Sequence, residues 1–185
     1  MKLAVLGAGA VGTSVVELAG DYGHEVVAVA DSSSAVVDSS GIDPETVIAR
    51  KADGGSVGSE DPEAALAADY DVLVEATPTT LGDAEPGFSH VTRALDRDRH
   101  VVLANKGPVA ERYGDVQAAA RDSDGEVRVG PRLVPENGTL AVTGTRNIVQ
   151  LDTEHAGRLN ISGRGAGGPE TASAVLADVG RLARR

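Results

Sequence analysis

The stretch that decides the fold follows Met1 directly and reads Lys2-Leu3-Ala4-Val5-Leu6-Gly7-Ala8-Gly9-Ala10-Val11-Gly12. The apolar run over residues 2–6 predicts a buried strand, and the apolar spacing from Val11 to Ala19 predicts a helix directly after it. The turn between them has the pattern G-x-G-x-x-G. In this pattern Gly7 permits the tight turn, Gly9 lets backbone amides approach a diphosphate, and Gly12 lets helix and strand pack closely. The helix N-terminus would then face the anion.

A second apolar run, Val26 to Ala30, ends at Asp31, nineteen residues beyond Gly12. This is the spacing at which an acidic side chain accepts hydrogen bonds from the ribose hydroxyls of a dinucleotide, which favours NAD over NADP. Arg50 and Lys51 could instead turn toward the same pocket and neutralise a 2′-phosphate, so both cofactors stay open, with NAD first. Two plainer explanations also remain: small residues suit any tight turn, and Asp31 could cap the serine-rich loop that follows it.

Strands and helices alternate through the next hundred residues, which predicts an α/β fold with a doubly wound parallel sheet of the Rossmann type. Loops are expected at 32–41 and 53–61. Further strands are expected at Asp71–Glu75 and His100–Leu103, and helices at Ile42–Lys51, from Asp61 onward, at Pro86–Asp98 and at Ala110–Arg121.

The pattern changes after Gly125, where short apolar runs follow one another with Pro, Gly and Asn turns between them. We expect a small antiparallel appendage here, closed by a final helix from Pro169 to about Ala183. The predicted organisation is therefore a dinucleotide-binding domain over 1–125 and a C-terminal segment over 126–185. The strand candidates in this segment are Val127–Val134, Leu140–Thr143, Ile148–Leu151 and Arg158–Ser162.

The composition narrows the class of protein. The net charge of −11 argues against a general affinity for nucleic acid or anionic membranes. The chain has no cysteine, which excludes disulfides and thiolate chemistry, and its four histidines lack metal-site spacing, so we expect no metal and take each as a surface or cap residue. No membrane span or secretory leader is evident, so a cytoplasmic protein is expected. Scattered acidic residues with only three lysines suggest adaptation to high salt.

Several motifs resemble homoserine dehydrogenases. Thr77-Pro78-Thr79, Gly82-Asp83-Ala84-Glu85-Pro86 with Ser89-His90, and Ala104-Asn105-Lys106-Gly107-Pro108 match motifs of that family at corresponding places. The resemblance covers residues 1–122 and resumes in the tail, at Leu140-Ala141-Val142, Gly144, Asn147 and Gly165-Ala166-Gly167-Gly168-Pro169, with Thr171 to Val175 after them. It implies an NAD- or NADP-dependent oxidoreductase of threonine and methionine biosynthesis that interconverts L-homoserine and L-aspartate 4-semialdehyde as a homodimer.

The resemblance also implies roles for particular residues. Lys106 matches the family lysine that lies beside the cofactor and engages the reacting oxygen of the substrate; the alternative is a solvated surface lysine. Thr77, Pro78, Ala104 and Asn105 would line the nicotinamide-ribose side. The loop at 163–168 could approach the cofactor or serve as a packing turn. The expected cofactor-binding residues are Gly7, Gly9, Ala10, Val11, Gly12, Asp31, Ser32, Lys51, Thr77, Pro78, Ala104, Asn105 and Gly167.

One departure from the family matters for function. Homoserine dehydrogenases carry a substrate domain between the nucleotide-binding half and the C-terminal segment, with a second catalytic lysine, carboxylates that hold the amino acid and ligands for a monovalent cation. Here residues 125–128 run directly into 131–135 and none of these elements is present. We therefore expect dinucleotide binding with weak or absent homoserine oxidation. The alternatives are a non-catalytic nucleotide-binding module that pairs with a full-length enzyme, and a small dehydrogenase that acts on another carbonyl.

Overall fold

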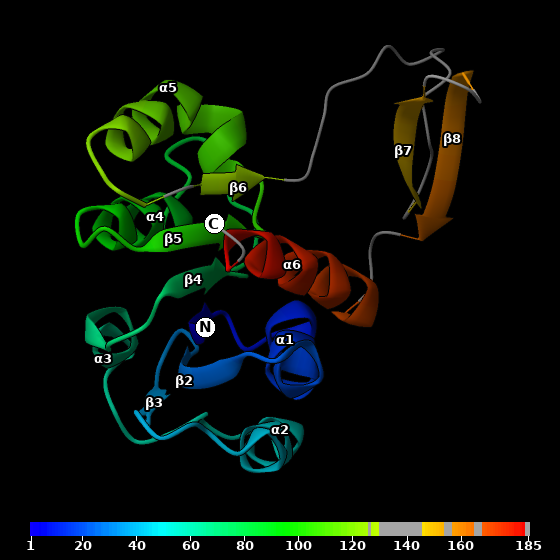
Figure 1. Cartoon of the computed structure of the whole chain (residues 1–185). Helices are drawn as coiled ribbons and strands as arrows, with labels where there is room; N and C mark the ends of the chain where they lie inside the picture. Colours follow the sequence, from blue (N-terminus) through cyan, green and yellow to red (C-terminus); the bar gives the residue numbers. More distant parts are fainter. Residues whose placement is uncertain (126, 130–145, 154–156, 165–167, 184–185) are drawn as a thin grey trace.

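The computed structural model describes residues 1–125, 127–129, 146–153, 157–164 and 168–183. Its main feature is a six-stranded sheet in the order β3-β2-β1-β4-β5-β6, in which all neighbours are parallel except the pair β2–β3 (Figure 1). The expected α/β architecture is therefore confirmed. The strands are β1 (Lys2–Leu6), β2 (Glu25–Ala30), β3 (Ala35–Val37), β4 (Val72–Glu75), β5 (His100–Leu103) and β6 (Val127–Val129).

Helices cover both faces of this sheet, because successive side chains along each strand point to opposite sides. Leu3 and Val5 of β1 pack into one buried cluster, with residues of α1 and α6, whereas Ala4 and Leu6 pack into the other, with residues of α3, α4 and α5. The helices are α1 (Ala10–Leu18), followed by the 3-10 turn η1 (Ala19–Tyr22), then α2 (Pro44–Ala52), α3 (Pro62–Ala67), α4 (Gly87–Leu95), α5 (Gly107–Arg121) and α6 (Gly168–Leu182).

Two of the helices begin as their sequences predict. Asp43 precedes Pro44 and accepts a hydrogen bond from the Glu45 amide at 3.2 Å. Asp61 precedes Pro62 in the same way and accepts from the Glu63 amide at 2.9 Å. An aspartate cap satisfies one free amide of the first turn, and proline at the first helical position loses no hydrogen bond.

The structure corrects three of the expected elements. The segment 32–41, expected as a loop, contains β3, which pairs antiparallel with β2. Helix α5 begins at Gly107 rather than Ala110. The segment from Val127, expected in an antiparallel appendage, instead adds β6 to the main sheet, parallel to β5.

The C-terminal part of the chain has two described pieces. The strands β7 (Arg146–Thr153) and β8 (Gly157–Arg164) form an antiparallel hairpin, as expected for 148–151 and 158–162. Helix α6 returns to the main sheet and lies along α1 (Figure 1). The strand expected at 140–143 lies outside the described residues. A domain boundary at residue 125 stays a prediction. Beyond that residue, β6 pairs with β5 and α6 packs on α1.

The order of the strands fixes where a ligand can enter. The chain leaves β1 toward β2 and β3, then crosses back to place β4, β5 and β6 on the other side. Connections therefore diverge between β1 and β4, and in open α/β sheets a crevice forms at this point beyond the carboxyl ends of the strands. No helix among the described residues is both long and apolar enough to span a bilayer.

Candidate functional site

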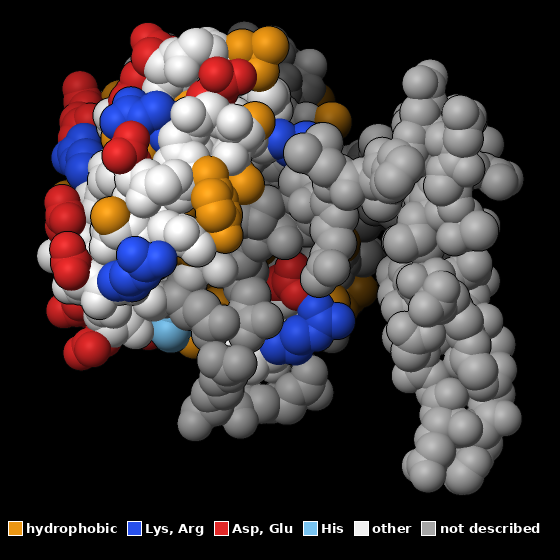
Figure 2. Space-filling model, turned by 90° about the horizontal axis from the view of Figure 1, so that it is seen from above, with side chains coloured by type: hydrophobic (Ala, Val, Ile, Leu, Met, Phe, Trp, Pro, Cys, Tyr) orange, Lys and Arg blue, Asp and Glu red, His pale blue; other side chains and the backbone are white. Residues whose placement is uncertain are grey.

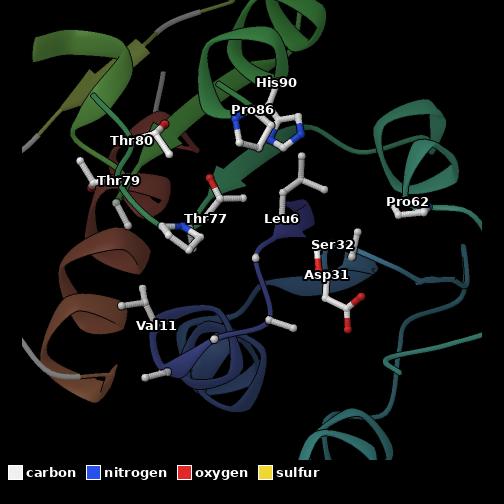
Figure 3. A pocket seen from close by; sticks show the side chains of 18 of the residues that line it. Leu6, Val11, Asp31, Ser32, Pro62, Thr77, Thr79, Thr80, Pro86 and His90 are labelled. Atoms are coloured by element: carbon white, nitrogen blue, oxygen red, sulfur yellow. The ribbon is translucent and has the colours of Figure 1, made fainter. Parts of the chain in front are cut away.

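A cavity of about 890 Å³ lies at this divergence point, at the carboxyl ends of β1, β2 and β4 (Figure 3). Its volume falls in the range typical of small-molecule and cofactor sites. It is lined by Leu6, Gly7, Ala8, Gly9, Ala10, Val11, Ala30, Asp31, Ser32, Lys51, Pro62, Glu63, Leu66, Ala76, Thr77, Pro78, Thr79, Thr80, Pro86, His90 and Ala104.

The turn between β1 and α1 forms the floor of the cavity, and its three glycines differ in their surroundings. Gly7 has φ +99°, and a Cβ built there would lie 2.5 Å from the carbonyl atoms of Ala76. A Cβ on Gly12 would lie 1.8 Å from the Gly7 oxygen. At Gly9, by contrast, a Cβ would meet nothing within 4 Å.

The open space at Gly9 faces the start of α1. Gly9 is the N-cap of this helix, makes no side-chain cap, and no acidic side chain lies in the first turn. The first amides of a helix have no partner within it and attract anions. The turn therefore leaves both the room and the donors that a diphosphate requires.

Asp31 marks one end of the cavity. Its Oδ1 accepts hydrogen bonds from the backbone amides of Ser33 and Ser34, at 2.9 Å and 2.8 Å, and from both hydroxyls. Its Oδ2 pairs with Lys51 Nζ at 3.0 Å. Burial alone would raise the pKa of Asp31, but the hydrogen bonds from Ser33, Lys51 and Ser34 outweigh it and hold that pKa well below its ordinary value.

The two basic residues proposed near Asp31 differ in position. Lys51 lines the cavity and is already paired with Asp31. Arg50 does not line it; its Nη1 donates to the Val57 carbonyl at 2.9 Å, which ties the guanidinium to a loop. Of the two, only Lys51 is placed to meet a ligand in this cavity.

The loops after β4 and β5 close the other end through a buried network. Asn105 Nδ2 donates to Thr77 Oγ1 at 3.1 Å, and Asn105 Oδ1 accepts from the Gly107 amide at 2.9 Å. Thr77 Oγ1 in turn donates to Glu75 Oε1, and its amide donates to the same oxygen at 3.3 Å. Thr77 thus lines the cavity while Asn105 is buried behind it, as support rather than as part of the wall.

His90 enters the wall from the first turn of α4, beside Pro86 (Figure 3). Its Nδ1 lies 3.3 Å from Glu75 Oε1. The sequence suggested a surface or cap histidine, and the structure places the His90 side chain, 19% exposed, in the wall of the cavity. No local sequence pattern could have predicted this position of His90, because its carboxylate partner Glu75 is fifteen residues away on β4.

Lys106 lies at the border of the site. It precedes α5, its amide donates to Thr79 Oγ1 at 3.3 Å, and its side chain is exposed. It does not line the cavity, although Ala104, two residues before it, and Thr79, which its amide contacts, do. Its position at the carboxyl end of β5 agrees with the expected neighbourhood, and its chemical role stays a prediction.

Most of the predicted site residues meet in this cavity. Ten of them line it: Gly7, Gly9, Ala10, Val11, Asp31, Ser32, Lys51, Thr77, Pro78 and Ala104. Gly12 and Asn105 lie behind the wall, Lys106 lies outside it, and Gly167 lies outside the described residues. The main wall residues that sequence reasoning missed are Pro62, Glu63, Leu66, Thr79, Thr80, Pro86 and His90.

The fold and the cavity define an α/β protein with a site of the dinucleotide-binding kind. A sequence model described as homoserine dehydrogenase matches residues 83–179, and one described as glutamate/leucine/phenylalanine/valine dehydrogenase matches residues 1–80. The first match covers more than half of the chain. The chain therefore belongs to the homoserine dehydrogenase family.

Known relatives agree with this assignment. The chain is 30% identical over 138 residues to a homoserine dehydrogenase of Methanocaldococcus jannaschii, a match that covers 65% of this chain and 41% of that protein. It is 45% identical over 51 residues to an NAD(+)-dependent homoserine dehydrogenase of Pseudomonas canavaninivorans, which covers 28% of this chain and 14% of that protein. The chain thus spans less than half the length of these relatives.

Solved structures support the fold. A homoserine dehydrogenase of Thermoplasma acidophilum superposes with a TM-score of 0.80 at 16% identity, over 100% of this chain and 99% of that chain. A hyperthermophilic archaeal homoserine dehydrogenase in complex with NADPH superposes with a TM-score of 0.69 at 14% identity, over 96% of each chain.

Proposed function

We propose that this chain binds a nicotinamide dinucleotide across the cavity, with the diphosphate at the start of α1. The observation that carries the proposal is the empty space at Gly9, between glycines that the fold itself requires. When bound, the dinucleotide supplies a hydride acceptor or donor. The chain's own residues then bind the diphosphate through backbone amides, hold the adenosine ribose at Asp31, and cover the far end with Thr77, Pro78 and Ala104.

We propose NAD as the preferred cofactor. The carboxylate of Asp31 faces the cavity, and a 2′-phosphate placed beside it would be repelled. Lys51 moderates this preference. Its ammonium lies 3.0 Å from that carboxylate and could pair with a 2′-phosphate instead. Relatives point both ways, since one is named as NAD(+)-dependent and a structural neighbour was solved with NADPH.

The experiment is a pair of fluorescence titrations with NADH and NADPH in molar KCl. We expect saturable binding of both, with NADH tighter. Lys51→Ala should weaken NADPH more than NADH, because it removes the cation that pairs with Asp31 in the wall of the cavity. Tighter binding of NADPH than of NADH would contradict the preference, and binding of neither would overturn the proposed function.

We propose that this chain catalyses the reaction of the family weakly or not at all. That reaction is the NAD(P)-dependent interconversion of L-homoserine and L-aspartate 4-semialdehyde. The chain has three lysines. Lys2 Nζ donates to the Ser39 carbonyl and Lys51 pairs with Asp31, which leaves Lys106 to polarise a substrate oxygen. One lysine does not fix an amino acid in a reactive geometry, which is where much of the rate arises.

Lys106→Met tests this role. We expect NADH binding within about twofold of the unaltered chain, because Lys106 is outside the wall, and complete loss of any turnover of homoserine. Turnover by the unaltered chain with kcat on the order of 10 per second would show that the lost elements are not needed.

A non-catalytic role as a module that pairs with a full-length enzyme is the second candidate. It is favoured by the same shortage of substrate-binding groups. Co-expression with a full-length homoserine dehydrogenase, followed by purification on a tag carried by this chain, distinguishes the two. Mixed oligomers support the module, whereas recovery of this chain alone, as a dimer, favours the independent protein.

A further inference from the structure

Glu75 is a buried carboxylate that the proposed dinucleotide binding does not use. It ends β4 at the divergence point, and its side chain is 0% exposed. Helix α4 packs so closely on it that a Cβ built on Gly87 would lie 3.4 Å from Glu75 Oε2 and 2.5 Å from Asn105 Nδ2. A buried carboxylate is costly unless hydrogen bonds compensate for the lost water, so its contacts need an account.

The contacts of Glu75 converge on one oxygen. Oε1 accepts from the Thr77 amide and hydroxyl and lies 3.3 Å from His90 Nδ1, whereas Oε2 has no hydrogen-bond partner among the described residues. Because Asn105 Nδ2 donates to Thr77 Oγ1, the hydroxyl proton of Thr77 must point to Glu75. Oε1 is therefore an acceptor toward Thr77, and the tautomer of His90 that carries its proton on Nδ1 adds a third donor to the same oxygen.

This tautomer decides which ring nitrogen can meet a ligand. With Nδ1 donating to a buried carboxylate, Nε2 is the ring nitrogen left for a ligand, and the ring is held in one orientation. His90 is 19% exposed and lines the cavity. In Figure 3 it lies above Leu6, with Thr80 on one side and Ser32 and Pro62 on the other, so it faces the middle of the cavity.

We propose that His90 is a dinucleotide-binding residue that uses Nε2 to contact an oxygen of the ribose–diphosphate backbone, and that Glu75 is the residue that positions it. A dinucleotide with its diphosphate at Gly9 and its adenosine ribose at Asp31 would present its ribose and diphosphate oxygens to the same cavity that His90 lines. This inference rests on the proposed function, since it assigns further residues to the same site.

The test separates the two ends of the ring. Asparagine at position 90 can place its amide near Nδ1 and keep the bond to Glu75, but it lacks the atom that reaches into the cavity. His90→Asn should therefore keep the unfolding midpoint near that of the unaltered chain and weaken NADH binding about tenfold, as His90→Ala does. Ser89→Ala, on the exposed side of the same turn, is the matched control and should change neither quantity.

ADP-ribose identifies the part of the ligand involved, because it carries both riboses and the diphosphate but no nicotinamide. His90→Asn should weaken ADP-ribose as much as NADH. A loss confined to NADH would overturn the assignment to the ribose–diphosphate backbone. Equal NADH binding by His90→Asn and the unaltered chain would overturn the inference while leaving the proposed function intact, whereas no binding by the unaltered chain would overturn both.

Glu75 is tested without relying on turnover. Nitrogen NMR of the histidine rings should show a proton on His90 Nδ1 in the unaltered chain and in Glu75→Gln, whose amide oxygen can replace Oε1. Glu75→Gln should bind NADH within about threefold of the unaltered chain, and Glu75→Ala should lose as much binding as His90→Ala. A ring protonated only on Nε2, or full binding by a folded Glu75→Ala, would show that Glu75 does not position His90. If Glu75→Ala does not fold, the nitrogen spectrum decides the point.

Discussion

At the scale of single residues, the turn between β1 and α1 contains one glycine that the packing requires and one that it does not. A methyl group added at Gly12 would collide with the Gly7 carbonyl oxygen, whereas one added at Gly9 would meet open space. The two positions are identical in chemistry and differ only in what surrounds them. The pair therefore offers a direct test of which glycine serves which purpose.

Gly12→Ala should lower the free energy of unfolding by about 3 kcal/mol or more, because the added methyl must push helix from strand. Gly9→Ala should leave that free energy nearly unchanged and weaken NADH binding about tenfold, since its methyl occupies the space proposed for the diphosphate. Urea denaturation and fluorescence titration measure the two effects. Equal stability loss in both variants would show that Gly9 is also a packing glycine.

Asp31 gives a prediction in pH. Its pKa is depressed in the folded protein, so its contribution to stability is complete above the ordinary aspartate pKa of about 3.9 and is lost as the pH falls toward the folded value. Below about pH 4 the free energy of unfolding should therefore fall, and Asp31→Asn should reduce that slope. Asp53→Asn, at an exposed position after α2, is the control. An unchanged slope in Asp31→Asn would mean that other carboxylates carry the acid sensitivity.

At the scale of elements, α6 packs on α1 and the main sheet although it is far from them in sequence. Ala172, Leu176 and Val179 share a buried cluster with Val15 and Val16 of α1. Leu176→Ala should lower the free energy of unfolding by about 2–5 kcal/mol, because Leu176 is 0% exposed. Leu81→Ala, at a site 72% exposed, should cost little. Denaturant unfolding measures both, and a small loss in Leu176→Ala would mean that α6 docks weakly.

The elements also show how far the sequence could predict the fold. The core strands β1, β2, β4 and β5 were placed correctly because apolar β-branched runs between turn signals are a local property. β3 was missed because three residues in a serine-rich segment give no such run. The parallel pairing of β6 and the docking of α6 could not be predicted, since periodicity shows that a face is buried but not which neighbour covers it.

The same distinction applies to the site. Gly7, Gly9, Asp31 and Thr77 were found because each lies in a short motif or at the end of a strand. His90 was not, because its place in the wall depends on Glu75 of another element and on the close approach of α4. Local patterns thus predicted wall residues that lie in short motifs or at strand ends, and missed a side chain whose place depends on tertiary contacts.

At the scale of the whole molecule, the surface is strongly acidic. The net charge is −11, and Figure 2 shows acidic side chains along one side of the described surface with fewer basic ones between them. Like charges repel one another. At 0.1 M salt this repulsion is screened only between charges more than about 10 Å apart, and at 1 M already beyond about 3 Å. The unfolding midpoint should therefore rise between 0.1 M and 2 M KCl. Sucrose at equal osmolality is the control, and a midpoint that is highest in low salt would contradict adaptation to salt.

The contact between α6 and α1 joins two helices that the ribosome makes at different times. Gly168, the first residue of α6, lies against α1, where a Cβ would come 2.5 Å from the Ala10 carbonyl, so the two helices meet at their starts. During translation α1 leaves the ribosome more than 150 residues before α6 does. Until then Val15 and Val16 of α1 lack the cover that α6 gives them, and the nascent chain exposes these apolar side chains although all residues that line the cavity, 6–104, have already been made.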